Sequence, residues 1–228
     1  MKKRLLYFSI LLFQLFFFNN VLAGDTSYVL LRIRGIELIP PELDNGHYLK
    51  LQLMTTLQNE WRKKAVVLIP SDDSSQVNSR QINFTVEVSI VELHVNEPII
   101  SQQTRSVSRD VTSNTYKDEA EDLRKEHTTV YADLTVTEKS MNALLRLSIY
   151  TTKFPEAISL WSEIVDGSFT WENKSATYSG SYQALGSKEI VLVKTKPKPA
   201  PKEIEVYKDV VRQCINKSSR KIAQSISP

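Results

Sequence analysis

Alternation of apolar and polar residues along three segments constrains the fold of this chain more than any other feature. The pattern is most regular from Ile82 to Ile90, and residues 130–136 and 143–149 repeat it. Because successive side chains of a β-strand point to opposite faces, a period of two predicts strands that each bury one face. A further strand, or a pair of strands, is expected over residues 161–171.

Two other segments repeat apolar residues with the period of an α-helix. Large apolar side chains recur every four positions from Leu49 to Trp61, and those between Ile204 and Ile226 cover one arc of a helical wheel. Short apolar segments at 28–33 and 65–69 predict strands on either side of the first helix. This order of elements predicts an α+β fold, with helices packed on one face of a mixed, mostly antiparallel sheet.

The first twenty-three residues have the composition of a secretory signal peptide. A basic start, Lys2–Arg4, precedes an apolar run from Leu5 to Phe18, and small residues lead to a predicted cleavage site after Ala23. The apolar run is shorter than the roughly 20 residues that a membrane-spanning helix needs. These features predict a periplasmic or secreted protein with no integral membrane span after cleavage.

The expected organisation has four parts. Residues 1–23 are the signal peptide, residues 24–193 a strand-rich α+β domain, residues 194–201 a proline-rich spacer, and residues 202–228 a C-terminal helix that packs on the domain. Residues 96–127 are polar and are expected to form a long excursion between strands. Charge spacing within 117–126 favours a solvated helix there, and Glu138-Lys139 is expected to connect two strands of a hairpin.

Charge and cysteine content exclude several classes of protein. The leader holds three of the 29 basic residues and none of the 26 acidic ones, so the remaining chain is neutral. Neutrality predicts no nucleic-acid partner, and no polybasic patch indicates binding to anionic lipid. Cys214 is the only cysteine, which excludes an internal disulfide and places a small apolar side chain at the centre of the C-terminal helix.

Motifs of known chemistry are absent from the sequence. The three histidines are far apart, and no glycine spacing fits a phosphate loop, so no catalytic, cofactor-binding or metal-ligating residue is predicted. Trp161 and Trp171 share strand parity and are the candidates for a binding surface for carbohydrate or peptide, with core packing as the alternative. Paired carboxylates of a glycoside hydrolase remain open, because such residues meet only in the folded chain.

The order of segments resembles a family of bacterial envelope proteins. A helix at Tyr48–Lys64 is followed by Val66–Ile69 and a long strand pattern at Asn83–Val95, and later Phe154–Trp161 leads into Val165–Gly167 before the C-terminal helix. This arrangement is similar to the αβ domain of proteins related to the curli-secretion lipoprotein and the peptidoglycan-synthase activator lipoproteins. The resemblance implies a bacterial cell-envelope protein with an αβ domain.

Together these features predict an exported cell-envelope protein that acts as a non-catalytic binding or assembly-accessory module. Its expected partner is an envelope protein or polymer. Two alternatives remain open at this point, namely a hydrolase that uses dispersed carboxylates and a structural subunit of a larger envelope complex. The sequence leaves the oligomeric state open as well.

Overall fold

The computed structural model of the protein describes residues 26–226, except residues 45, 63, 73–76, 78–80 and 121. The predicted signal peptide and its cleavage site after Ala23 lie outside these residues. In chain order the elements are β1 (Ser27–Arg34), η1 (Ile36–Leu38), η2 (Pro41–Leu43), α2 (His47–Glu60), β2 (Val66–Pro70), β3 (Phe84–Val95), β4 (Ile99–Lys117), β5 (Leu123–Lys153), β6 (Ile158–Gly180), η3 (Tyr182–Ala184), α4 (Ser187–Lys194) and α5 (Glu203–Ser225). No helix in this described part of the chain has the length and apolar character to cross a membrane.

The strands form one mixed sheet, in the order β2-β1-β3-β5-β4, and β6 also pairs with β5. β1 lies parallel to both of its neighbours, β2 and β3, whereas β4 and β5 are antiparallel. Parallel pairing of β1 with β2 is possible because α2 connects them as a crossover. The predicted α+β class is therefore confirmed, with a mixed, mostly antiparallel sheet and helices packed on one face.

The chain divides into two compact units, each assembled from separate segments. Unit 1 comprises residues up to His94, residues 144–167 and residues from Tyr207 onward. Unit 2 comprises residues 95–143 and 168–206. β5 and β6 contribute residues to both units, and each unit is described by itself below.

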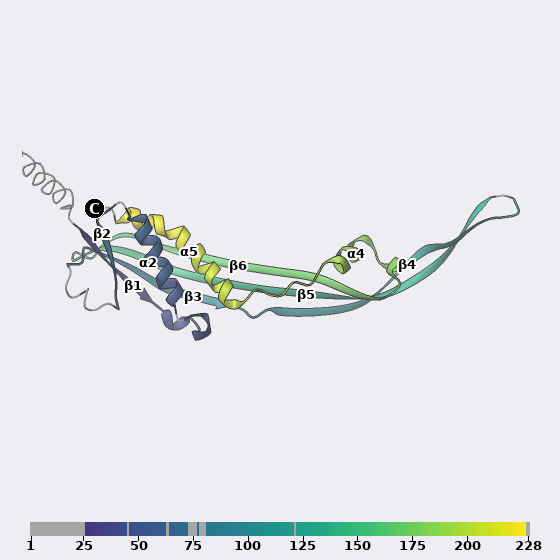
Figure 1. Ribbon diagram of the computed structural model, residues 1–228, viewed down its shortest axis with the longest axis horizontal. Coiled ribbons are helices and arrows are strands. Elements are labelled where there is room, and N and C mark those ends of the chain that lie inside the picture. The colour runs from purple at the N-terminus through teal and green to yellow at the C-terminus, as the bar shows by residue number, and fades with distance from the viewer. Residues whose placement is uncertain are drawn as a thin grey trace, which may run out of the picture. The chain divides into compact units, whose positions relative to one another are not determined.

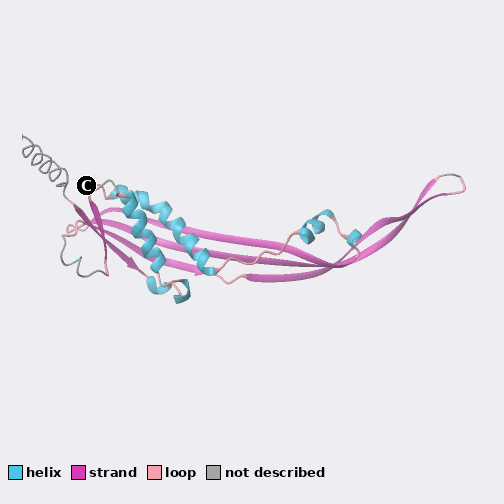
Figure 2. Ribbon diagram, in the orientation of Figure 1, coloured by secondary structure: helices cyan, strands magenta, loops and turns pink. Residues whose placement is uncertain are grey.

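The core of unit 1 lies between its strands and the helices α2 and α5. One face of β1 and β3 is buried at Val29, Leu31, Val86 and Val88, and α2 contributes the fully buried row from Leu49 to Leu57. Figures 1 and 2 show α2 and α5 side by side along the strands. The indole of Trp61, just after α2, donates a 3.4 Å hydrogen bond to the carbonyl of Ala223 on α5. The periodic apolar rows recognised in the sequence are thus the rows that form this core.

Unit 2 has a smaller core of its own. Ala132 and Leu134 of β5 and Ala176 of β6 pack with Ala184 and Leu185, and residues of α4 cover the cluster. Much of β4 is exposed instead, because few of its side chains meet this cluster. Polar side chains link β4 to β5; for example, Ser106 donates a 2.6 Å hydrogen bond to Asp133.

Two local predictions were wrong. Residues 96–127, expected as an excursion with a helical part, form β4 and the beginning of β5, paired from Ile99↔Ser140 to Lys117↔Leu123 with a shift of register between Thr112 and Asn114. Glu138-Lys139, expected as a hairpin connection, lies inside β5. The pairing of β4 with the beginning of β5 was missed because most side chains of these strands are exposed. Strands that bury little need no alternation of apolar and polar residues, so the sequence pattern of a buried strand is absent. Side-chain pairs across the strands stabilise this pairing instead.

Cys214 is buried on α5, as its place on the apolar arc indicates. Its thiol donates to the carbonyl oxygens of Leu145 and Val165, at 3.4 and 3.8 Å. Burial is the main cause that raises the pKa of the thiol to about 12. The group therefore stays protonated at neutral pH and behaves as a small packed side chain rather than as a nucleophile.

Candidate functional site

A concave surface of unit 1 lies on the face of the sheet opposite the helices. Leu31 and Val86 point into the core, so their strand neighbours Leu30, Arg32, Thr85 and Glu87 point to the opposite face, where Leu30 is itself only 4% exposed. The register pairs Leu30 with Thr85 and Arg32 with Glu87, which sets two rows of side chains next to each other. Tyr150 and Thr152 of β5 continue this surface.

These side chains form the floor of a hollow of about 900 Å³, called here the outer-face hollow. Its end is closed by residues before β3 and after β5. The lining includes Leu30, Arg32, Gln81, Ile82, Thr85, Glu87, Tyr150, Thr152, Lys153, Phe154, Ala157 and Ser159. Tyr150 and Phe154 are 46% and 53% exposed, so two aromatic rings on this face are open to a ligand.

Asn83 holds the closed end of the hollow in place. Its backbone N–H donates to the carbonyl of Tyr28 at 2.9 Å, and its side-chain oxygen accepts from the N–H of Tyr28 at 2.7 Å. The carbonyl of Asn83 accepts a 2.8 Å hydrogen bond from the N–H of Phe154. One residue thus joins the start of β1, the start of β3 and the turn that carries Phe154.

Among the described residues that line the hollow, one cationic side chain has no carboxylate partner. Glu87 is engaged by Arg34 at 2.9 Å, and Lys153 by Glu156 at 3.3 Å. The side chain of Arg32, by contrast, has no ion pair or hydrogen bond with the described residues. An apolar hollow with a free guanidinium fits a ligand that has an apolar body and an anionic group.

Glu87 is the one carboxylate among the described lining residues, and it is already paired with Arg34. A glycosidase needs two carboxyl groups that flank the scissile bond. In addition, the described residues contain no group of three or more histidine, cysteine, aspartate or glutamate side chains placed to hold a metal ion.

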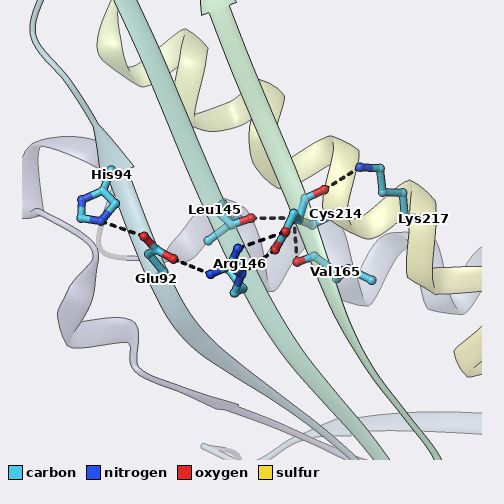
Figure 3. Close-up of polar contacts among 8 residues, drawn as sticks. Glu92, His94, Leu145, Arg146, Val165, Cys214 and Lys217 are labelled. Atoms are coloured by element: carbon cyan, nitrogen blue, oxygen red, sulfur yellow. Dashed lines mark hydrogen bonds and ion pairs between the residues drawn. The ribbon is translucent and has the colours of Figure 1, made fainter.

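A separate charged network lies farther along unit 1. Arg146 of β5 contacts Asp166 of β6 at 2.9 Å and Glu92 of β3 at 2.8 Å. Figure 3 shows Glu92 between His94 and Arg146, with Glu92 and His94 3.1 Å apart. Asp166 is the main cause that raises the pKa of Arg146. Because two carboxylates already hold this guanidinium, it ties three strands together and is not available to a ligand as Arg32 is.

The structure places the two predicted surface tryptophans in different units. Trp161 belongs to unit 1 and Trp171 to unit 2, and both are half-buried on β6. Glu163, two residues after Trp161, pairs with Lys221 of α5, and neither tryptophan is among the described residues that line the hollow. A binding role for Trp161 and Trp171 stays a prediction.

The residues of the hollow were missed at the level of sequence. Leu30 and Arg32 lie in a short strand whose apolar composition predicts only burial, and Phe154 follows a strand end. The single usable signal is Arg32, a charged residue inside the apolar run from Val29 to Ile33. Such a residue indicates that one face of the strand is not buried.

Comparisons with known proteins identify no family. No protein-family model and no curated protein matches the chain. Among solved structures it is similar to a minor lipoprotein from Acinetobacter baumannii, with 10% identity, 88% of this chain and 95% of that chain covered, and a TM-score of 0.33. It is also similar to a neuraminyllactose-binding hemagglutinin homolog from Helicobacter pylori, with 11% identity, 89% and 84% covered, and a TM-score of 0.31. Similarity at this level does not allow the function of either protein to be assigned to this chain.

Proposed function

We propose that this protein is an exported, non-catalytic binding module of the bacterial cell envelope, and that the outer-face hollow of unit 1 is its binding site. The observation that carries the proposal is the hollow of about 900 Å³ with exposed Tyr150 and Phe154 and with Arg32, whose side chain no described residue engages in an ion pair or hydrogen bond. The ligand has an apolar or aromatic body over the two rings and an anionic group at Arg32. Partner chains and envelope polymers that bear such groups fit this description.

Export is proposed from the leader and is tested separately. The protein recovered from an extracytoplasmic fraction should begin at Gly24, because the small residues up to Ala23 suit signal peptidase. N-terminal sequencing measures this directly. Recovery of the chain with Met1 to Ala23 intact in the cytoplasm would contradict the export proposal without affecting the site.

The aromatic part of the hollow is tested with a neutral fluorescent probe, phenylnaphthylamine. The double variant Tyr150→Ala and Phe154→Ala should bind it on the order of a hundredfold more weakly, because each of the two rings offers on the order of 1.5 kcal/mol of apolar contact. Tyr131→Ala removes a 67% exposed ring from unit 2 and serves as the matched control. Equal affinity of the double variant and the parent would rule out the hollow as the site.

The charge of the hollow is tested with anilinonaphthalene sulfonate, which adds an anionic group to a similar ring system. Arg32→Gln should lower the affinity for this probe by roughly fivefold to tenfold and leave the affinity for phenylnaphthylamine unchanged, since the guanidinium interacts only with the anionic group. Glu87→Gln should have the opposite effect and increase the affinity for the anionic probe. Arg220→Gln, an equal change of charge on the exposed side of α5, is the control. Equal losses in Arg32→Gln and Arg220→Gln would show that net charge alone is responsible.

A further inference from the structure

Unit 2 carries a second concave surface, independent of the outer-face hollow. A groove of about 520 Å³ lies where β4, β5 and β6 meet the segment that follows α4. Lys139 comes from β5, and Lys194 and Lys196 come from the end of α4 and the residues after it. No aspartate or glutamate is among the described residues that line this lysine groove.

The three lysines are not compensated by the rest of the described chain. The ammonium group of none of them forms an ion pair or a hydrogen bond with another described residue. The nearest carboxylates in sequence have other partners: Glu138 pairs with Lys174, and Glu189 pairs with Arg105 at 2.9 Å. The groove therefore holds a local excess of positive charge in a chain that is otherwise close to neutral.

The segment that brings Lys194 and Lys196 to the groove is anchored. Thr195 caps the end of α4, where its hydroxyl donates a 2.8 Å hydrogen bond to the carbonyl of Val191. Three residues on, the N–H of Lys198 donates to the side-chain oxygen of Asn173 at 3.1 Å. Pro197, between Lys196 and Lys198, restricts the backbone further. The backbone that carries Lys194 and Lys196 is thus held beside β6.

We propose that the lysine groove binds an oligosaccharide chain that carries anionic substituents. The lysines would pair with its sulfate, phosphate or carboxylate groups. Hydroxyl and amide groups of Thr137, Ser175 and Gln102 line the same groove and suit the hydroxyls of a sugar. A concave surface lined in this way fits a chain that enters it better than it fits a flat bilayer.

The test measures binding of a dextran sulfate oligosaccharide to the whole protein, with uncharged dextran of equal length as the reference. The parent should bind only the sulfated chain, and more weakly as salt is added. The triple variant Lys139→Gln, Lys194→Gln and Lys196→Gln should lose about tenfold or more in affinity. A matched triple, Lys117→Gln, Lys125→Gln and Lys188→Gln, removes the same charge from exposed positions of unit 2 outside the groove and should change little.

Several results would overturn the proposal. Equal losses in the two triple variants would mean that net charge, and not the groove, drives binding. If the triple variant in the groove kept both the affinity for dextran sulfate and the melting temperature of the parent, the oligosaccharide would bind elsewhere on the protein. Binding of phosphatidylglycerol vesicles through these lysines, without binding of dextran sulfate, would make the surface a membrane contact instead.

Discussion

Replacement of Gly167 by alanine is expected to destabilise unit 1 by about 3 kcal/mol or more. Gly167 lies in β6 directly beneath α5. A Cβ atom added there would lie 2.2 Å from the carbonyl oxygen of Val210 and 3.0 Å from the sulfur of Cys214. The first of these neighbours is backbone, so α5 would have to move away from the strand. Loss of that contact would reduce burial along the helix.

Thermal or denaturant unfolding of the variant measures this effect. Gly186→Ala is the matched control, because its added Cβ would meet only the carboxylate end of Glu189, at 2.5 Å, and that flexible side chain can turn away. The control should unfold close to the parent. A Gly167→Ala protein with the melting temperature of the parent would show that α5 does not approach β6 as closely as described.

The double variant Val211→Asp and Ile215→Asp should prevent stable folding of unit 1. Val211 and Ile215 are 0% and 1% exposed on the face of α5 that packs in the core. Each change removes roughly 1.5–3 kcal/mol of apolar burial and adds the larger cost of burying a charge without a partner. The sum is comparable to the whole stability of a typical domain, about 5–15 kcal/mol.

Circular dichroism and thermal unfolding provide the measurement. Asn216→Asp and Arg220→Asp introduce the same side chain at exposed positions of the same helix and should cost little. If both pairs of variants melted like the parent, α5 would contribute no burial to unit 1. It would then be an amphipathic helix free to dock elsewhere.

The elements with strong apolar periodicity were predictable, because burial dictates their pattern. Leu49 to Leu57, the strand around Val86 and the arc centred on Cys214 all lie where the sequence places them. Gly167 was visible as a glycine inside a strand, which often marks a close approach of two backbones. The partner in that approach, the carbonyl of Val210, could not be found without the fold.

The exposed elements and both concave surfaces could not be predicted in the same way. β4 buries little, so its sequence looks like that of a polar loop. The hollow joins Arg32, Glu87 and Tyr150 from three strands, and only their register brings them together. In the lysine groove, Lys196 lies in a visible run of lysines and prolines, but Lys139 joins it only through folding.

The most direct test of the binding proposal is to map where anilinonaphthalene sulfonate binds, by backbone amide chemical shifts in the labelled protein. As the probe saturates, the largest shifts should fall at residues 30–32, 82–87 and 150–159, which line the outer-face hollow. The same shifts should require a higher probe concentration in Arg32→Gln. Largest shifts in residues 95–143, or a saturating fluorescence signal with no shift around the hollow, would contradict the account.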